Sequence, residues 1–232
     1  MSRFRTFVVI ALGLVLLWRA TPGASAQAEL DAVLRQMEAT GRAFKSFSAN
    51  FAQKKYTAIL KEFDQPETGI FVYARARDGS ALLRQEVQKP GVRILTINGG
   101  VAKLYQPKMK QATIMNLGKN KDKAEYLALG LGQSPAKLRE TFDIKYVGTE
   151  TIAGVPTSVL SLKPKSGAAA AYFSSITLWV KKANGVPIQQ KLTEPNGDYL
   201  LVNFSGEKLN IKTSPAMFEQ KFGPGTEVQT VR

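Results

Sequence analysis

The sequence predicts a mainly β fold of the α+β class, with about ten strands in one antiparallel sheet that curls around a few helices. Alternating apolar and polar residues recur at fairly even spacing from residue 47 to residue 204. Turn sequences such as Asn98-Gly99-Gly100 and Asn184-Gly185 separate these runs. No linker rich in proline, glycine or serine divides the chain, so a single domain is expected over residues 27–232.

The first 26 residues are predicted to form a secretory signal peptide that is removed from the mature chain. They begin with two arginines, continue with a twelve-residue apolar run from Phe7 to Trp18, and end in the small-residue cleavage signal Ala24-Ser25-Ala26. The alternative is a membrane anchor, but a span needs about 20 apolar residues and Arg19 ends this run. Because Gln27 and not cysteine follows the cut, we expect the mature chain to be free, without a lipid anchor, in the periplasm or another extracytoplasmic compartment.

Composition argues against most classes of enzyme. The 232 residues include no cysteine and no histidine, which excludes disulfides, thiolate nucleophiles and a Ser-His-Asp relay. Any metal site would have to be built from carboxylates and carbonyls alone, and the sequence contains no convincing carboxylate pair for acid–base catalysis. We therefore expect no enzymatic activity, no metal and no cofactor.

The charge balance favours anionic partners. Removing residues 1–26 takes away three arginines and no acidic residue, so the mature chain keeps 29 of the 32 basic residues against 18 acidic ones, a net charge of +11. An exported protein meets little nucleic acid, so anionic lipid head groups or acidic proteins are the expected partners. The alternative is a solvated basic surface that only keeps the chain soluble.

Helical periodicity appears at the start of the mature chain and again near its middle. Gly41 offers a stop for the first helix, and Asn120 can cap a second one that carries Leu127. Ser134 can cap a further short helix with Pro135 at its first position. The first helix shows the i, i+3, i+4, i+7 spacing at Leu30, Val33, Leu34 and Met37.

Strand patterns account for most of the remaining chain. From Phe47 the apolar period changes to two, with Phe47, Ala49 and Phe51 on one side of an alternating run. The later strands are predicted at Gly69–Ala74, Ala81–Val87, Val92–Ile97, Val101–Tyr105, Gln111–Met115, Phe142–Glu150, Thr157–Lys163, Ser175–Lys181, Val186–Glu194 and Tyr199–Phe204.

A sheet of this size has an inner face that two short helical segments cannot obviously cover. Either the sheet closes tightly on its own side chains, or it leaves an apolar cavity for a hydrophobic ligand. Periodicity alone leaves both possibilities open.

The mature chain resembles the periplasmic outer-membrane lipoprotein carrier family, the LolA-like proteins, over nearly its whole length. The opening helix leads into Ser46–Gln53 (SFSANFAQ), similar to the family's S-F-x-A-x-F-x-Q, and Gly69–Tyr73 resembles its glycine-led strand. Ile97–Pro107 (INGGVAKLYQP) resembles the family's hairpin ending in Y-x-P. Phe218 with the later Pro224-Gly225 resembles its terminal F-x-P-P-x-G.

The resemblance implies a half-open antiparallel β-barrel with helices as a lid over a hydrophobic cavity. Members of the family take acylated lipoproteins from an inner-membrane transporter and pass them to an outer-membrane receptor, without cofactor or chemical reaction. We therefore expect a monomeric periplasmic carrier of acylated lipoproteins or lipids, with transient membrane contact and no nucleic acid among its partners. The alternative is a basic adaptor with a filled core that binds acidic proteins or anionic membranes.

The resemblance also implies a functional arginine after the first long strand, where it holds the lid through helix backbone. Arg75 takes that place, although Ala76 replaces the family's proline, residues 77–80 look like an inserted turn, and Arg77 is a second candidate. A solvent-facing edge charge is the other interpretation of Arg75. Leu83 matches an apolar cavity position, whereas Gln85 replaces a tryptophan. The expected cavity and lid residues are Leu34, Phe47, Phe51, Phe71, Tyr73, Arg75, Leu83, Ile94, Leu104, Ile114, Leu127, Ile176 and Leu178.

Overall fold

The structure is a computed structural model that describes residues 22–118, 126–165 and 167–231. The apolar run of the predicted signal peptide and the predicted cap Asn120 lie outside these residues. The helical elements are α1 (Pro22–Arg42), the 3-10 turn η1 (Pro107–Met109), α3 (Pro135–Thr141), α4 (Ala168–Tyr172) and η3 (Pro215–Phe218). Helix α1 includes both sides of the predicted cleavage point, and the cleavage stays a prediction.

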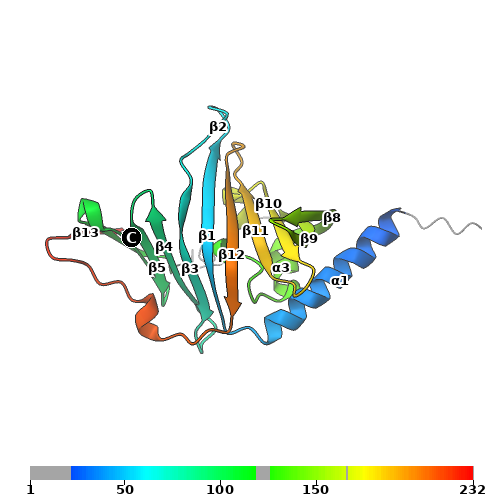
Figure 1. Cartoon of the computed structure of the whole chain (residues 1–232), viewed down its shortest axis with the longest axis horizontal. Helices are drawn as coiled ribbons and strands as arrows, with labels where there is room; N and C mark the ends of the chain where they lie inside the picture. Colours follow the sequence, from blue (N-terminus) through cyan, green and yellow to red (C-terminus); the bar gives the residue numbers. More distant parts are fainter. Residues whose placement is uncertain (1–21, 119–125, 166, 232) are drawn as a thin grey trace, which may run out of the picture.

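The strands form one 13-stranded open sheet, in the order β13-β7-β6-β5-β4-β3-β1-β12-β11-β10-β9-β8, with β2 paired to β1 (Figure 1). All neighbours are antiparallel except β13 and β7. The predicted mainly β fold is confirmed. The strands are β1 (Ser46–Thr57), β2 (Glu62–Phe63), β3 (Glu67–Arg75), β4 (Ala81–Lys89), β5 (Arg93–Asn98), β6 (Val101–Gln106), β7 (Gln111–Asn116), β8 (Phe142–Ile152), β9 (Val155–Pro164), β10 (Ser175–Lys181), β11 (Pro187–Thr193), β12 (Tyr199–Leu209) and β13 (Glu227–Val231).

Two strands were not predicted, and each lacks a local signal. Strand β2 has only two residues and forms by extending the β1 hairpin. Strand β13 is exposed along its whole length, so it shows no buried alternation, and it pairs in parallel with a strand more than a hundred residues earlier. Such a pairing is a property of the tertiary structure, not of the local sequence.

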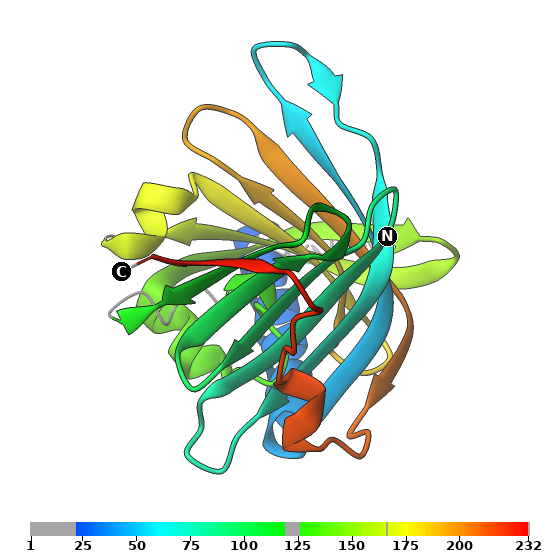
Figure 2. The ribbon, with the colours of Figure 1, turned by 90° about the vertical axis from the view of Figure 1, so that its left-hand side faces the viewer.

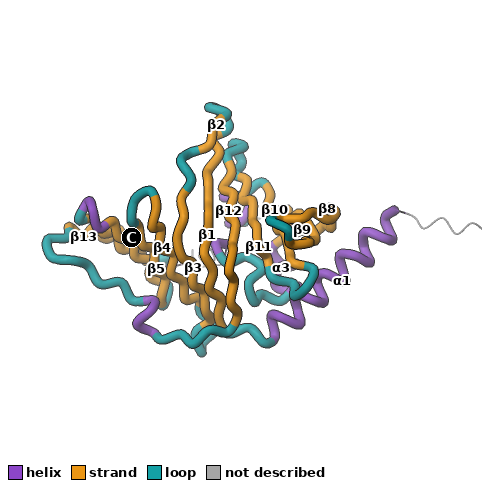
Figure 3. Tube along the Cα trace, in the orientation of Figure 1, coloured by secondary structure: helices purple, strands orange, loops and turns teal. Residues whose placement is uncertain are grey.

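Helix α1 covers part of one face of the sheet, which we call the inner face. Its predicted apolar side, which includes Leu34 and Met37, is buried in the same core cluster as Phe47 and Leu178 of the strands. Helix α3 packs beside α1, and the Ser134 cap is confirmed, because its side chain accepts a hydrogen bond from the Lys137 amide at 3.2 Å. Figure 3 shows how little of the chain is helical beside the continuous array of strands.

The turn between β10 and β11 fastens α1 to the sheet. Gln36 Nε2 donates a hydrogen bond to the Lys182 carbonyl at 2.6 Å, and Thr40 Oγ1 donates one to the Asn184 carbonyl at 2.5 Å. Gly185 has a positive φ of 70°, and a Cβ added there would lie 2.8 Å from backbone atoms of α1. The absence of a side chain at this position is therefore what lets the turn approach the helix so closely.

The C-terminal segment lies across the opposite, outer face of strands β3 to β6. In Figure 2 this segment, orange-red to red, crosses in front of the green strands while α1 lies behind them. Phe218 is buried in a second apolar cluster with Val72 and Ala74 of β3. Further along, the rings of Tyr105 and Phe222 lie 5.3 Å apart. Each face of this part of the sheet therefore has its own apolar layer.

Candidate functional site

The inner face is defined by the pairing register, because directly opposed residues of neighbouring strands point to the same side of a sheet. Tyr73 pairs with Leu83, Leu83 with Ile97, Ile97 with Ala102, and Ala102 with Met115. All five belong to the core cluster or pack against it. This row is a continuous apolar stripe that crosses five strands from β3 to β7.

One half of the inner face is largely covered. Phe47 lies at its centre, with its ring 6.2 Å from Phe71 and 5.6 Å from Phe204, both in edge-on geometry. Helix α1 and the segment around Leu131 bury most of this half, and Ile144 and Tyr146 of β8 stay half-buried at its edge. The predicted residues that lie here are Leu34, Phe47, Phe51, Phe71, Tyr73, Leu83, Ile176 and Leu178, each at most 4% exposed.

The other half of the inner face is only partly covered. Leu95 and Met115 are half-buried and pack against the core cluster, and Leu104 pairs directly with Leu95. Leu127, which follows the undescribed residues 119–125, is also half-buried against the same cluster. We call Leu95, Leu104 and Met115 the open half of the inner face. It offers apolar surface that is continuous with the core but still reached by solvent.

Two predicted cavity residues lie on the wrong face for that role. Ile94 pairs with Glu86 and Tyr105, and Ile114 pairs with Lys103, all on the outer face. The sequence could not separate Ile94 from Leu95 or Ile114 from Met115, because both members of each pair are apolar. A shift by one residue reverses the face of every side chain in a strand, so only the register identifies Leu95 and Met115 as the inner residues.

Arg75 lies on the inner side of β3, in the same alternation as Tyr73, and pairs with Ala81. It is half-buried on a strand inside the sheet, so it is not a solvent-facing edge charge. Its Nε is buried and has no hydrogen-bond partner among the described residues. Arg77, the second candidate, is exposed in the turn that links β3 and β4.

A buried amide fixes the segment that follows the undescribed residues 119–125. Gln190 of β11 is 1% exposed, and its Nε2 donates a hydrogen bond to the Leu129 carbonyl at 3.0 Å. The Gln133 side chain accepts a hydrogen bond from the Gly130 amide at 3.2 Å. Gln190 is not among the predicted site residues, because a lone glutamine on an alternating strand carries no local signal of this contact.

A polar rim limits the apolar surface where β1, β3, β4 and β5 meet. Gln85 Nε2 donates a hydrogen bond to Gln53 Oε1 at 2.9 Å, and Gln53 Nε2 donates one to Glu67 at 2.7 Å. Arg93 pairs with the same Glu67 carboxylate at 2.8 Å. These side chains satisfy one another, so the rim presents hydrogen-bonding groups beside the apolar stripe.

The acidity of Tyr146 and that of Tyr105 are shifted in opposite directions. Burial, and to a smaller extent the negative charge of Glu29, raise the pKa of Tyr146 on the inner face. The Gly223 amide, which donates to the Tyr105 hydroxyl at 3.1 Å, lowers the pKa of Tyr105 on the outer face. Among the described residues there is no group of three acidic side chains that could hold a metal ion.

The amino-acid sequence that forms most of the sheet matches a known protein family. Residues 42–221 match the model of the family described as outer membrane lipoprotein carrier protein LolA. The chain belongs to the LolA family. The match covers most of the described sheet, so the resemblance drawn from the sequence motifs is confirmed. The comparison with curated protein sequences finds no match.

Solved structures share this fold at low sequence identity. The MucB crystal structure is 16% identical, with a TM-score of 0.52, and the match covers 87% of this chain but 66% of MucB. An uncharacterized conserved protein from Thermus thermophilus is also 16% identical, with a TM-score of 0.50 and coverage of 89% of this chain and 99% of that protein. This chain thus spans just under two thirds of MucB. At such identities the likeness concerns the fold alone.

Within the described residues, every helix is too short or too polar to span a membrane.

Proposed function

We propose that this LolA-family protein is a periplasmic carrier that shields acyl chains of lipoproteins, or of lipids, on the inner face of its sheet. The observation that carries this proposal is the open half of the inner face, where Leu95 and Met115 keep solvent-accessible apolar surface against a buried core and Leu104 lies directly beside Leu95. Membership in a family described as lipoprotein carriers supports the choice of ligand.

The energetics suit this task. An acyl chain in water costs about 0.8 kcal/mol per exposed methylene, so a chain of ordinary length costs on the order of 10 kcal/mol. Aliphatic side chains offset most of that cost without demanding a particular orientation. Transfer between this face and another site of similar apolarity is then governed by small differences in affinity. No chemical reaction and no cofactor is required.

The proposal includes the route of the cargo. The predicted signal peptide at residues 1–26 directs the chain to the periplasm, where it takes cargo from an inner-membrane transporter and passes it to an outer-membrane receptor. We also propose that Arg75 holds the helical lid. Its buried Nε, which has no partner among the described residues, supports a role that involves a further acceptor.

Neighbouring residues of β7 provide a matched test of cargo binding. Met115 and Ile114 are both half-buried, but they point to opposite faces. A photo-crosslinking amino acid at position 115 should attach to an acylated lipoprotein, whereas the same group at position 114 should not. In the purified protein, Met115→Asp should weaken binding of a fluorescent fatty acid at least tenfold, because a carboxylate resists burial against hydrocarbon, and Ile114→Asp should leave it within about twofold.

Three results would contradict the carrier function. They are absence of saturable fatty-acid binding by the wild-type protein, equal crosslinking at positions 114 and 115, and lipoprotein crosslinks at position 114 alone. Strong salt dependence of association with acidic proteins, together with no bound lipid, would instead support the basic adaptor.

Replacement of each of the two arginines tests the lid separately. Arg75→Leu should change the rate at which bound cargo is released, whereas Arg77→Leu, in the exposed turn, should not. Release is followed by transfer of a fluorescent acylated peptide to lipid vesicles. An unchanged release rate in Arg75→Leu would reject the lid role without affecting the proposal of cargo binding.

A further inference from the structure

The β1–β2 hairpin ends in residues 58–61, which we call the tip, and it projects beyond the rest of the sheet (Figure 1). Thr57 pairs with Glu62, and Lys61 closes the turn with a positive φ of 54°. Ile59 and Leu60 are 89% and 65% exposed, the two highest values among the large apolar side chains that the structure describes. Water contact at two adjacent aliphatic side chains is unfavourable, so a partner that covers them would gain free energy.

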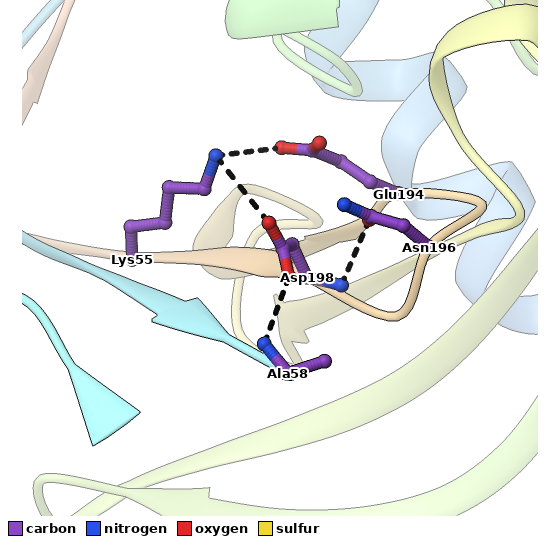
Figure 4. Close-up of polar contacts among 5 residues, drawn as sticks. All are labelled: Lys55, Ala58, Glu194, Asn196 and Asp198. Atoms are coloured by element: carbon purple, nitrogen blue, oxygen red, sulfur yellow. Dashed lines mark hydrogen bonds and ion pairs between the residues drawn. The ribbon is translucent and has the colours of Figure 1, made fainter. Parts of the chain in front are cut away.

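The neighbouring β11–β12 turn anchors the tip at its first residue, Ala58 (Figure 4). The Ala58 amide donates a hydrogen bond to Asp198 Oδ1 at 2.8 Å, and Lys55 Nζ lies 3.3 Å from Glu194 and 3.8 Å from Asp198. Asp198 is itself fixed by its amide, which donates to Asn196 Oδ1 at 3.1 Å. The backbone next to Ile59 is therefore bonded to the sheet, whereas both aliphatic side chains are exposed to solvent.

Directly beneath the tip lies a collar of aromatic rings. Tyr56 packs 5.1 Å from Phe63 and stacks 4.8 Å from Tyr199. Lys54 Nζ lies 4.0 Å from the centre of the Phe63 ring, and Lys191 Nζ lies 4.1 Å from that of Tyr199. From the tip inward, the two exposed aliphatic side chains and the exposed Lys61 are followed by the aromatic rings, against which the ammonium groups of Lys54 and Lys191 lie. This order matches the depth profile of a membrane interface, where aromatic rings lie at the headgroup level and lysines extend toward water.

We propose that the tip docks the protein on a lipid bilayer, with Ile59 and Leu60 inserted at the boundary between headgroups and acyl chains. A stable protein partner needs about 800 Å² of surface on each side, whereas two side chains on a convex turn offer little area. A wedge of this kind suits a soft surface that it can enter by about 5–10 Å. Without the predicted signal peptide the chain carries a net charge of +11, which adds attraction to anionic headgroups. The tip contributes no residue to the inner face, so this docking is independent of cargo binding.

The absence of cysteine makes a clean fluorescence test possible. Ile59→Cys carries a polarity-sensitive dye at the tip, and Val147→Cys, at a residue 64% exposed on β8, serves as the matched control. With vesicles of phosphatidylcholine and phosphatidylglycerol, the dye at position 59 should shift to the blue and the dye at position 147 should not. The shift should persist with vesicles of phosphatidylcholine alone, but with weaker binding.

Sedimentation with the same vesicles measures the contribution of the tip. The double variant Ile59→Ser/Leu60→Ser should reduce the partition coefficient about tenfold or more. The control variant Met109→Ser/Val147→Ser, which removes apolar side chains of similar exposure elsewhere, should change it less than about twofold. Fatty-acid binding should be equal in all three proteins, which separates this inference from the proposed carrier function.

Several outcomes would overturn the docking role. They are wild-type protein that does not sediment with anionic vesicles, equal partitioning of the two double variants, and absence of a blue shift at position 59. Light scattering that reveals a dimer dependent on Ile59 and Leu60, without vesicle binding, would assign the tip to a second copy of the chain and also overturn it.

Discussion

Replacement of Gly185 by alanine should loosen helix α1 from the sheet. The added methyl group would lie 2.8 Å from backbone atoms of Gln36 and Met37, a separation at which the helix or the turn must move. The positive φ of 70° adds conformational strain. Two nearby hydrogen bonds from α1 to the same turn would be displaced with it.

Gly154→Ala is the matched control, because Gly154 also has a positive φ, of 82°, but no atom lies within 4 Å of the added carbon. The strain of a left-handed alanine is about 1–2 kcal/mol and applies to both variants. Overpacking against α1 adds about 1–3 kcal/mol for Gly185→Ala alone. We therefore expect Gly185→Ala to be the less stable of the two by about 2 kcal/mol.

Urea unfolding measures this difference. With an m-value of about 3 kcal/mol/M, 2 kcal/mol corresponds to a midpoint lower by about 0.7 M. If the helix moves, the inner face is uncovered, so Gly185→Ala should also bind more 8-anilinonaphthalene-1-sulfonate than Gly154→Ala under native conditions. Equal midpoints and equal dye binding in the two variants would refute the claim that this glycine permits the docking of α1.

Three further outcomes are expected. Leu83→Ala, at a fully buried position of the inner face, should lower the free energy of unfolding by about 2–5 kcal/mol in urea titrations, and a loss under about 1 kcal/mol would contradict tight packing there. Gln190→Met keeps the side-chain length but removes the donor to the Leu129 carbonyl, so it should cost about 1–3 kcal/mol and speed amide exchange in the segment around that carbonyl. Tyr105 has a lowered pKa, so its contribution to stability is fully present above the ordinary tyrosine pKa and is lost as the pH falls through the lowered value. Absorbance titration in the near ultraviolet should show one early-ionising phenol that Tyr105→Phe removes, and an unchanged titration would contradict the effect of the Gly223 amide.

Local patterns in the sequence were sufficient for most of the secondary structure. The buried positions Leu30 and Met37 of α1 follow from helical spacing, and the cap at Ser134 follows from the Ser-Pro pair. Strand β10 has the bounds that the alternation predicts, from Ser175 to Lys181. These features depend on contacts between residues that are close in the chain, so short sequence patterns are enough to predict them. The family motifs, such as Ser46–Gln53, are also short stretches of sequence, and they identified the LolA-like fold.

Sequence patterns predicted only some of the residues of the candidate site correctly. The aromatic residues Phe47 and Phe51 could be assigned to the inner face because polar residues flank them. In Ile94-Leu95 both residues are apolar, so the pattern allowed either face and the wrong member was chosen. The protruding tip at Ile59 and Leu60 also escaped prediction, because an apolar pair in a loop does not reveal whether it is covered.

The sequence by itself determined the order of strands and turns, the basic charge and the apolar face of the first helix. The tertiary structure decided which side of β5 and β7 faces the core, where the C-terminal segment lies, and that β13 pairs in parallel with β7. The physical reason is the range of the interactions. Helical and strand periods arise from contacts between near neighbours in the chain, whereas register and the covering of a face depend on segments that meet only after the whole sheet has formed.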